Sequence, residues 1–121
     1  MTASLTPALA LEFITALSAD IRAAVVLGAD GERLAGPPEL ADAARALPDA
    51  SRLEGSTAAG AVFAARDERH TILIVTGPFA LPRVTRLDLR TALSALGGQT
   101  PPTGPLERLE DPVVTAVLRA L

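Results

Sequence analysis

The chain of 121 residues has the length of one ordinary domain, enough to bury roughly two thirds of the surface that its unfolded form exposes. Nearly half of the residues are hydrophobic (49%), but the only aromatic residues are three phenylalanines, so an aliphatic core is expected. The 11 basic residues are all arginine and face 14 acidic ones, and this net charge of −3 argues against nucleic-acid binding.

The composition also excludes most catalytic chemistry. The absence of lysine removes the phosphate-binding lysine of P-loops, the Schiff-base lysine and the Ser-Lys dyad. The absence of cysteine removes disulfides, thiolate catalysis and cysteine metal sites. A single histidine, His70, does not make a zinc site, and no acidic loop with cation-binding spacing is present. We therefore expect a binding or regulatory module with no catalytic residue, cofactor or metal.

Neither a signal peptide nor a membrane span is predicted. No basic residue precedes the apolar stretch 8–11, and Glu12 interrupts it early. No apolar run approaches the ~20 residues that a bilayer requires. We expect a cytoplasmic protein, in agreement with the absence of cysteine.

The first third of the chain predicts a helix followed by a hairpin. Pro7 stands at a first helical position, and apolar residues recur after it at helical spacing, which predicts a helix from about 7 to 18. Residues 21–28 form a strand rich in β-branched residues. The dipeptide Asp30-Gly31 then predicts a tight turn into a second strand, 32–36.

A short helix and a three-strand meander follow. Pro37 and Pro38 stop the second strand and begin a helix that ends at Pro48. Its apolar stripe consists of Leu40, Ala43, Ala44 and Leu47. Three extended segments then lie at 51–57, 60–66 and 71–76, and a second long helix runs from about 83 to 96.

The polarity of the strands predicts their order in the sheet. Residues 25–27 and 72–75 are continuously apolar, as expected of central strands that are covered on both faces. Residues 32–34 and 52–54 alternate with charges, as half-exposed edges do. We predict an α/β fold (in the broad sense, α+β): a five-stranded, mostly antiparallel sheet of order 2-1-5-4-3, with two helices on one face and the short helix on the other.

The last part of the chain is predicted to lie outside this domain. We predict a domain at 1–98, a proline-rich linker at 99–105 and an amphipathic helix at 106–121. The apolar side of that helix offers four candidate partner-binding residues: Val113, Val117, Leu118 and Leu121. Because so short a helix needs a surface to lie on, two interpretations remain. It either folds back on its own domain or binds a partner through a groove.

The order of elements over residues 7–97 resembles the roadblock family, which includes dynein light chains and bacterial regulators of Ras-like GTPases. The segments AAVVLGADGERLAG at 23–36 and LPRVTRLDLRTAL at 81–93 carry this resemblance. Longin, profilin-like and PAS-like domains share the pattern of an apolar strand, an Asp-Gly turn and a strand of small residues. The chain departs from the family at Asp20, where many members have a glycine.

The resemblance implies a homodimer, or a heterodimer, that acts as scaffold or regulator of a small Ras-like GTPase. Short helices pack against each other in such dimers, and the third strands join the two sheets. Self-pairing of the strand at 51–57 about Leu53 places Arg52 opposite the partner's Glu54. The predicted dimer interface comprises Leu40, Ala43, Ala44, Leu47, Arg52, Leu53 and Glu54.

Two other features have a functional and a plain interpretation. One stripe of the last long helix carries Arg83, Arg86 and Arg90. The functional interpretation is that they bind phosphate or an acidic partner, and the plain one is that they form an exposed helix face. His70 is either a pH sensor or general base or, as we prefer, a structural or exposed histidine, because the sequence places no nucleophile or orienting carboxylate near it.

The alternative function is a small-ligand-binding sensory domain of similar fold that has no GTPase partner. A cavity above ~300 Å³ between sheet and helix, lined by Phe63, Ile72 and Leu89, would favour this alternative.

Overall fold

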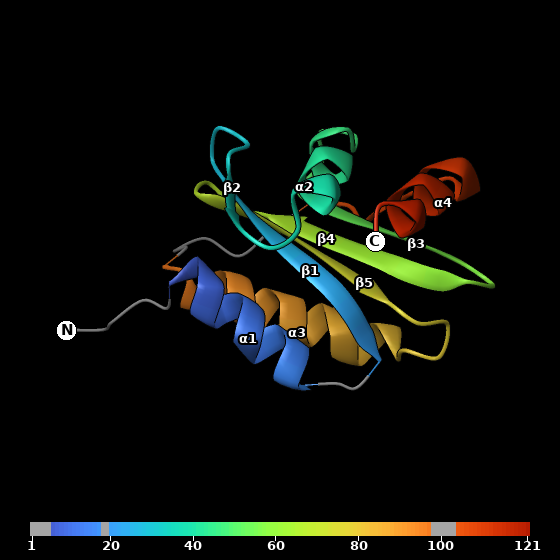
Figure 1. The fold of residues 1–121 in the computed structure, drawn as a ribbon, viewed down its shortest axis with the longest axis horizontal. Helices are drawn as coiled ribbons and strands as arrows, with labels where there is room; N and C mark the ends of the chain where they lie inside the picture. Colours follow the sequence, from blue (N-terminus) through green and yellow to red (C-terminus); the bar gives the residue numbers. More distant parts are fainter. Residues whose placement is uncertain (1–5, 18–19, 98–103) are drawn as a thin grey trace.

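A computed structural model of the chain describes residues 6–17, 20–97 and 104–121. These residues form a mixed six-stranded sheet between two layers of helices (Figure 1). The strands are β1 (Ile21–Gly28), β2 (Arg33–Ala35), β3 (Arg52–Thr57), β4 (Gly60–Arg66), β5 (His70–Thr76) and β6 (Glu107–Arg108). The helices are α1 (Pro7–Leu17), α2 (Pro38–Arg45), α3 (Pro82–Ala95) and α4 (Asp111–Arg119).

The strand order is β2-β1-β5-β4-β3-β6, so the predicted order 2-1-5-4-3 is confirmed for the first five strands. The central strands β1 and β5 pair antiparallel, with Val25 opposite Leu73. The β1–β2 turn follows the Asp-Gly signal, and Gly31 adopts a φ of 85°, in the left-handed region that glycine tolerates best. Helices α1 and α3 cover one face of the sheet and α2 lies on the other, also as predicted (Figure 1).

Alternation along the strands sorts the apolar side chains into two cores. Val26, Ile72 and Ile74 point toward α1 and α3, where they pack with Ile14 and Leu93. The intervening residues point toward the other helical layer; they include Val25, Leu73, Val75 and Val62. Each core is almost entirely aliphatic, in line with the composition, and among the described residues Phe63 is the one aromatic side chain in them.

A sixth strand corrects the prediction that β3 forms a free edge of a five-stranded sheet. β6 pairs parallel to β3, with Leu53 opposite Glu107 and Glu54 opposite Arg108. The N–H of Leu109 donates to the carbonyl of Glu54 at 2.8 Å and extends this pairing. The edge prediction failed because a strand of two residues is too short to produce an alternating pattern.

The chain after residue 103 folds back on its own domain. Val114 and Val117 of α4 are buried against the α2 face of the sheet. The close approach depends on Gly55, because a Cβ built there would lie 2.7 Å from a methyl group of Val114. Of the two interpretations of the tail, the structure therefore supports packing on its own domain. The predicted linker at 99–105 lies outside the described residues, except for Gly104 and Pro105.

The helices are short. Within 6–17, 20–97 and 104–121, none combines the length and the apolar character that crossing a bilayer requires.

Candidate functional site

The apolar stripe of α2 belongs to the core of its own protomer. Leu40 and Ala44 are fully buried, and Leu47 is nearly so. All three pack in the core that also holds Val25 and Leu73. The predicted interface helix therefore has no free apolar patch at these positions. Ala43 is only partly buried, and it packs at the margin of the same core.

The three predicted interface residues of β3 are also engaged within the protomer. Leu53 is 2% exposed and packs in the core beneath α2 and α4. Arg52 and Glu54 point to the opposite face, because side chains alternate along a strand. β6 occupies the outer side of β3 at Leu53 and Glu54. With β6 in this place, a second copy has no free strand edge there, so the predicted pairing of Arg52 with the partner's Glu54 does not form.

The four tail residues differ in their exposure. Val117 is buried, whereas Val113 and Leu118 are partly buried against the same core. Leu121 is 54% exposed at the end of the chain. The apolar side of α4 is thus largely occupied by its own domain, and Leu121 alone of the four leaves most of its surface free.

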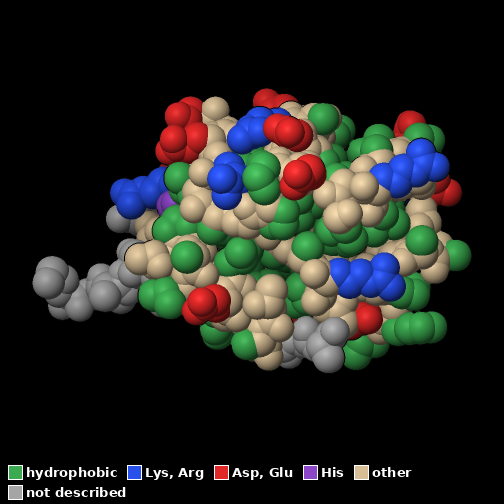
Figure 2. Space-filling model, viewed as in Figure 1, with side chains coloured by type: hydrophobic (Ala, Val, Ile, Leu, Met, Phe, Trp, Pro, Cys, Tyr) green, Lys and Arg blue, Asp and Glu red, His purple; other side chains and the backbone are tan. Residues whose placement is uncertain are grey.

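Helices α2 and α4 contact each other on one face of the sheet, and their outer surface is the first candidate site (Figure 1). We define the α2–α4 face by exposed residues of the two helices and by Ala46, which follows α2: Asp42, Arg45, Ala46, Ala116 and Arg119. Arg45 is fixed by an ion pair to Asp42 at 2.6 Å and by a hydrogen bond to the carbonyl of Gly31 at 2.7 Å. Side chains of both charges are intermixed over α2 (Figure 2). Ala43 of α2 is partly buried against the core cluster that also holds Val114 and Val117 of α4.

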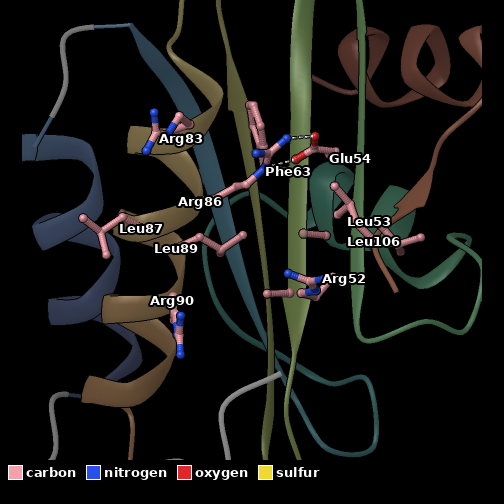
Figure 3. Close-up of a pocket in the computed structure, with 12 residues that line it drawn as sticks. Arg52, Leu53, Glu54, Phe63, Arg83, Arg86, Leu87, Leu89, Arg90 and Leu106 are labelled. Atoms are coloured by element: carbon pink, nitrogen blue, oxygen red, sulfur yellow. Dashed lines mark hydrogen bonds and ion pairs between the residues drawn. The ribbon is translucent and has the colours of Figure 1, made fainter. Parts of the chain in front are cut away.

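The second candidate site is a groove on the opposite face of the sheet. Helix α1 packs on β1 and β2, and α3 packs on β4 and β5, which leaves the face of β3 beside α3 open. The resulting cavity has a volume of about 390 Å³. Its apolar lining includes Phe63 and Leu89, and its polar lining comprises Arg52, Glu54, Arg83, Arg86 and Arg90. We call it the arginine groove (Figure 3).

An ion pair crosses the arginine groove. Arg86 extends from α3 to Glu54 on β3, with its Nε 2.7 Å from Oε2 and its Nη2 bonded to Oε1 (Figure 3). The hydrogen bond to Glu54 raises the pKa of the Arg86 guanidinium, which stays charged throughout the physiological range. The Glu54 side chain is 10% exposed and lies against the guanidinium of Arg86. The pair therefore fixes one arginine and neutralises one positive charge.

The other three arginines of the groove retain hydrogen-bonding capacity. Arg52 donates from Nη2 to the carbonyl of Gly104 at 2.8 Å, but its Nε is buried and has no partner among the described residues. Arg83 and Arg90 are exposed and have neither a hydrogen bond nor an ion pair within the described part of the chain. Four arginines against Glu54 leave the groove with three net positive charges, in a chain whose net charge is −3.

A further hollow of about 440 Å³ lies beside the β1–β2 and β4–β5 turns and includes His70. Several of its charged groups are already paired; Arg66, for example, bonds to Asp49 at 2.6 Å. His70 is half-buried, and its backbone N–H donates to Asp67 at 2.9 Å. Within the described residues, no three histidine or carboxylate groups are placed to hold a metal ion. We assign no site there.

Comparisons with known proteins give no assignment: neither a family model nor a curated protein sequence matches the chain. The resemblance to the roadblock family therefore stays an expectation from the sequence segments at 23–36 and 81–93.

Sequence reasoning found one wall of the arginine groove and missed the other. The helical stripe of Arg83, Arg86 and Arg90 was visible as a candidate anion-binding face. For Arg52 and Glu54, the sequence pattern instead predicts a place at a dimer edge. Arg52 and Glu54 lie in the same groove as the α3 arginines because β3 is the neighbour of β4 in the sheet. Since α3 packs on β4 and β5, it leaves the adjacent face of β3 uncovered.

Proposed function

We propose that this chain is a non-enzymatic regulatory or scaffold protein that binds a small Ras-like GTPase in the cytoplasm. The observation that carries the proposal is the layered arrangement: a sheet core of order 2-1-5-4-3, two helices on one face and a short helix on the other. This is the arrangement that the roadblock resemblance implies. The composition supports a binding role, because the chain has no cysteine, no lysine and a single histidine.

The α2–α4 face is the proposed docking surface. In the roadblock arrangement, two short helices from two subunits lie together. In this chain α4 contacts α2 within one protomer, so a single copy presents a two-helix surface. A surface that prefers one arrangement of the GTPase switches shifts the nucleotide cycle by its difference in affinity between the two states.

The homodimer also stays a prediction, and substitutions in its predicted interface do not test it cleanly. Leu53 and Ala44 are buried in the protomer, so a charge at either position would disrupt folding whether or not a dimer forms. Sedimentation of the unmodified chain measures its oligomeric state without this ambiguity.

The experiment that tests the GTPase proposal is native mass spectrometry. The chain is mixed with the Ras-like GTPase encoded nearest to it, loaded with GDP or with a non-hydrolysable GTP analogue. We expect a complex with at least one form, and we expect Ala116→Arg to abolish it by placing a long cationic side chain on the α2–α4 face. Ala16→Arg is the matched control, because Ala16 is an exposed helical alanine on α1. Failure of both nucleotide forms to bind would refute the proposal.

A second candidate function, the ligand-binding sensory domain, is favoured by the arginine groove. Its volume of about 390 Å³ lies within the range of small-molecule sites, roughly 300–1,000 Å³. Phe63 and Leu89 line it as this alternative requires, whereas Ile72 is fully buried and does not. The groove and the α2–α4 face lie on opposite faces of the sheet, so a ligand and a protein partner have separate surfaces.

A further inference from the structure

We propose that the arginine groove binds a small amphipathic anion, in which an apolar chain or ring carries one carboxylate or phosphate group. This inference rests on the second candidate function and is independent of GTPase binding at the α2–α4 face. The shape and the charge of the groove specify the two halves of such a ligand separately.

The apolar half fits the lining of the groove. Phe63, Ala65 and Leu89 contribute from β4 and α3, and Leu106 and Leu87 contribute from the chain before β6 and from α3. Leu106 and Leu87 are 37% and 62% exposed, so they retain apolar surface that a ligand would remove from water. A purely polar ion would leave the apolar surface of Leu87 and Leu106 exposed to water.

The anionic half fits the rim. Arg83 and Arg90 project from α3 without partners among the described residues, and the buried Nε of Arg52 lacks an acceptor on the opposite wall. A carboxylate or phosphate oxygen accepts hydrogen bonds from guanidinium groups in a geometry that arginine favours. Such an acceptor would give Arg83 and Arg90 the partner that they lack among the described residues, and it would offset the local excess of positive charge.

Glu54 sets the position of the anion within the groove. Because Glu54 already holds Arg86 through two hydrogen bonds, an incoming anion is directed to Arg52, Arg83 and Arg90. The same carboxylate repels the ligand's acid group. Glu54→Gln removes this repulsion and frees the positive charge of Arg86, so it is expected to strengthen anion binding although it weakens the fold.

The proposal is tested by isothermal titration with four probes: decanoate, decyl phosphate, decanol and inorganic phosphate. We expect decanoate and decyl phosphate to bind at least about tenfold more tightly than decanol, which lacks charge, and than phosphate, which lacks an apolar part. The first two probes distinguish a carboxylate preference from a phosphate preference. Equal binding of all four probes, binding of phosphate alone, or no binding would overturn the proposal.

Variants then locate the site. The double variant Arg83→Gln and Arg90→Gln removes two side-chain charges that have no hydrogen bond or ion pair within residues 6–17, 20–97 and 104–121, and it should weaken decanoate binding at least about tenfold. Arg69→Gln removes one exposed charge on the β4–β5 turn, outside the groove, and should leave binding unchanged. Glu54→Gln should strengthen it several-fold. Decanoate binding that survives the double variant, or that falls equally in Arg69→Gln, would refute the site.

The outcomes separate the two functions. The groove double variant should still form the GTPase complex, because the α2–α4 face is unchanged. Loss of decanoate binding with an intact complex would confirm the groove as a separate site. Absence of decanoate binding in the unmodified chain would remove the ligand proposal and leave the GTPase proposal standing. An acidic peptide that binds more tightly than decanoate would instead identify a protein docking groove and contradict a small ligand.

Discussion

Replacing Val114 and Val117 by alanine should remove much of the stability of this protein if α4 is part of its core. Both side chains are at most 2% exposed and lie against the sheet beside α2. Each Val→Ala substitution removes two methylene-sized groups, or about 1.6 kcal/mol of transfer free energy at about 0.8 kcal/mol per group. The cavities add to this cost, so the double variant should lose about 3 kcal/mol or more.

That loss is large compared with the stability of an ordinary domain, about 5–15 kcal/mol. It should lower the melting temperature by on the order of 10 °C. Urea denaturation followed by far-UV circular dichroism measures it without tryptophan, which the chain lacks. Leu121→Ala is the control, because Leu121 is largely exposed, and its midpoint should barely change. A double variant that unfolds at the midpoint of the unmodified chain would refute the packing of α4.

Three other predictions concern single positions. Gly55→Ala should cost about 1–3 kcal/mol in the same urea assay, because the new Cβ would meet Val114 and the backbone of Leu109, whereas Ser56→Ala next to it should not. Glu54→Gln should lower the urea midpoint, because it removes the negative charge and one of the two oxygens that accept hydrogen bonds from Arg86; an unchanged midpoint would mean that the pair is not formed in solution. Burial raises the pKa of Asp88 in the folded chain above its ordinary value of 3.8. The ionised carboxylate therefore lowers the free energy of unfolding, and this loss of stability develops as the pH rises from 3.8 through the pKa of the folded chain. Asp88→Asn should therefore melt higher than the unmodified chain at pH 7 and equally below that ordinary pKa, and an equal difference at both would contradict the assignment.

The local signals in the sequence were sufficient for most of the fold. The Asp30-Gly31 dipeptide marks the first turn, and the apolar runs at 25–27 and 72–75 identify the central strands. These features predict the order of five strands because each depends on the burial of a whole segment. The positions of α1, α2 and α3 follow from the lengths of the connections between them.

What the sequence did not predict depends on contacts between distant segments. β6 has two residues and therefore no periodicity, and its pairing with β3 is visible only after α4 is seen to dock beside Gly55. The glycine was the available signal, since a glycine inside a strand often marks a close approach of another backbone. Glu54 similarly looked like an edge charge, because its partner Arg86 is 32 positions away in the chain.

The affinity of the GTPase for this chain, measured by titration in its GDP form and in its GTP-analogue form, tests the proposed role most directly. The account predicts that one form binds more tightly by about fivefold or more, as coupled binding sites typically show, and that Ala116→Arg removes this binding while Ala16→Arg retains it. Absence of binding in both forms, or equal binding by the two variants, would contradict a regulator that acts through the α2–α4 face.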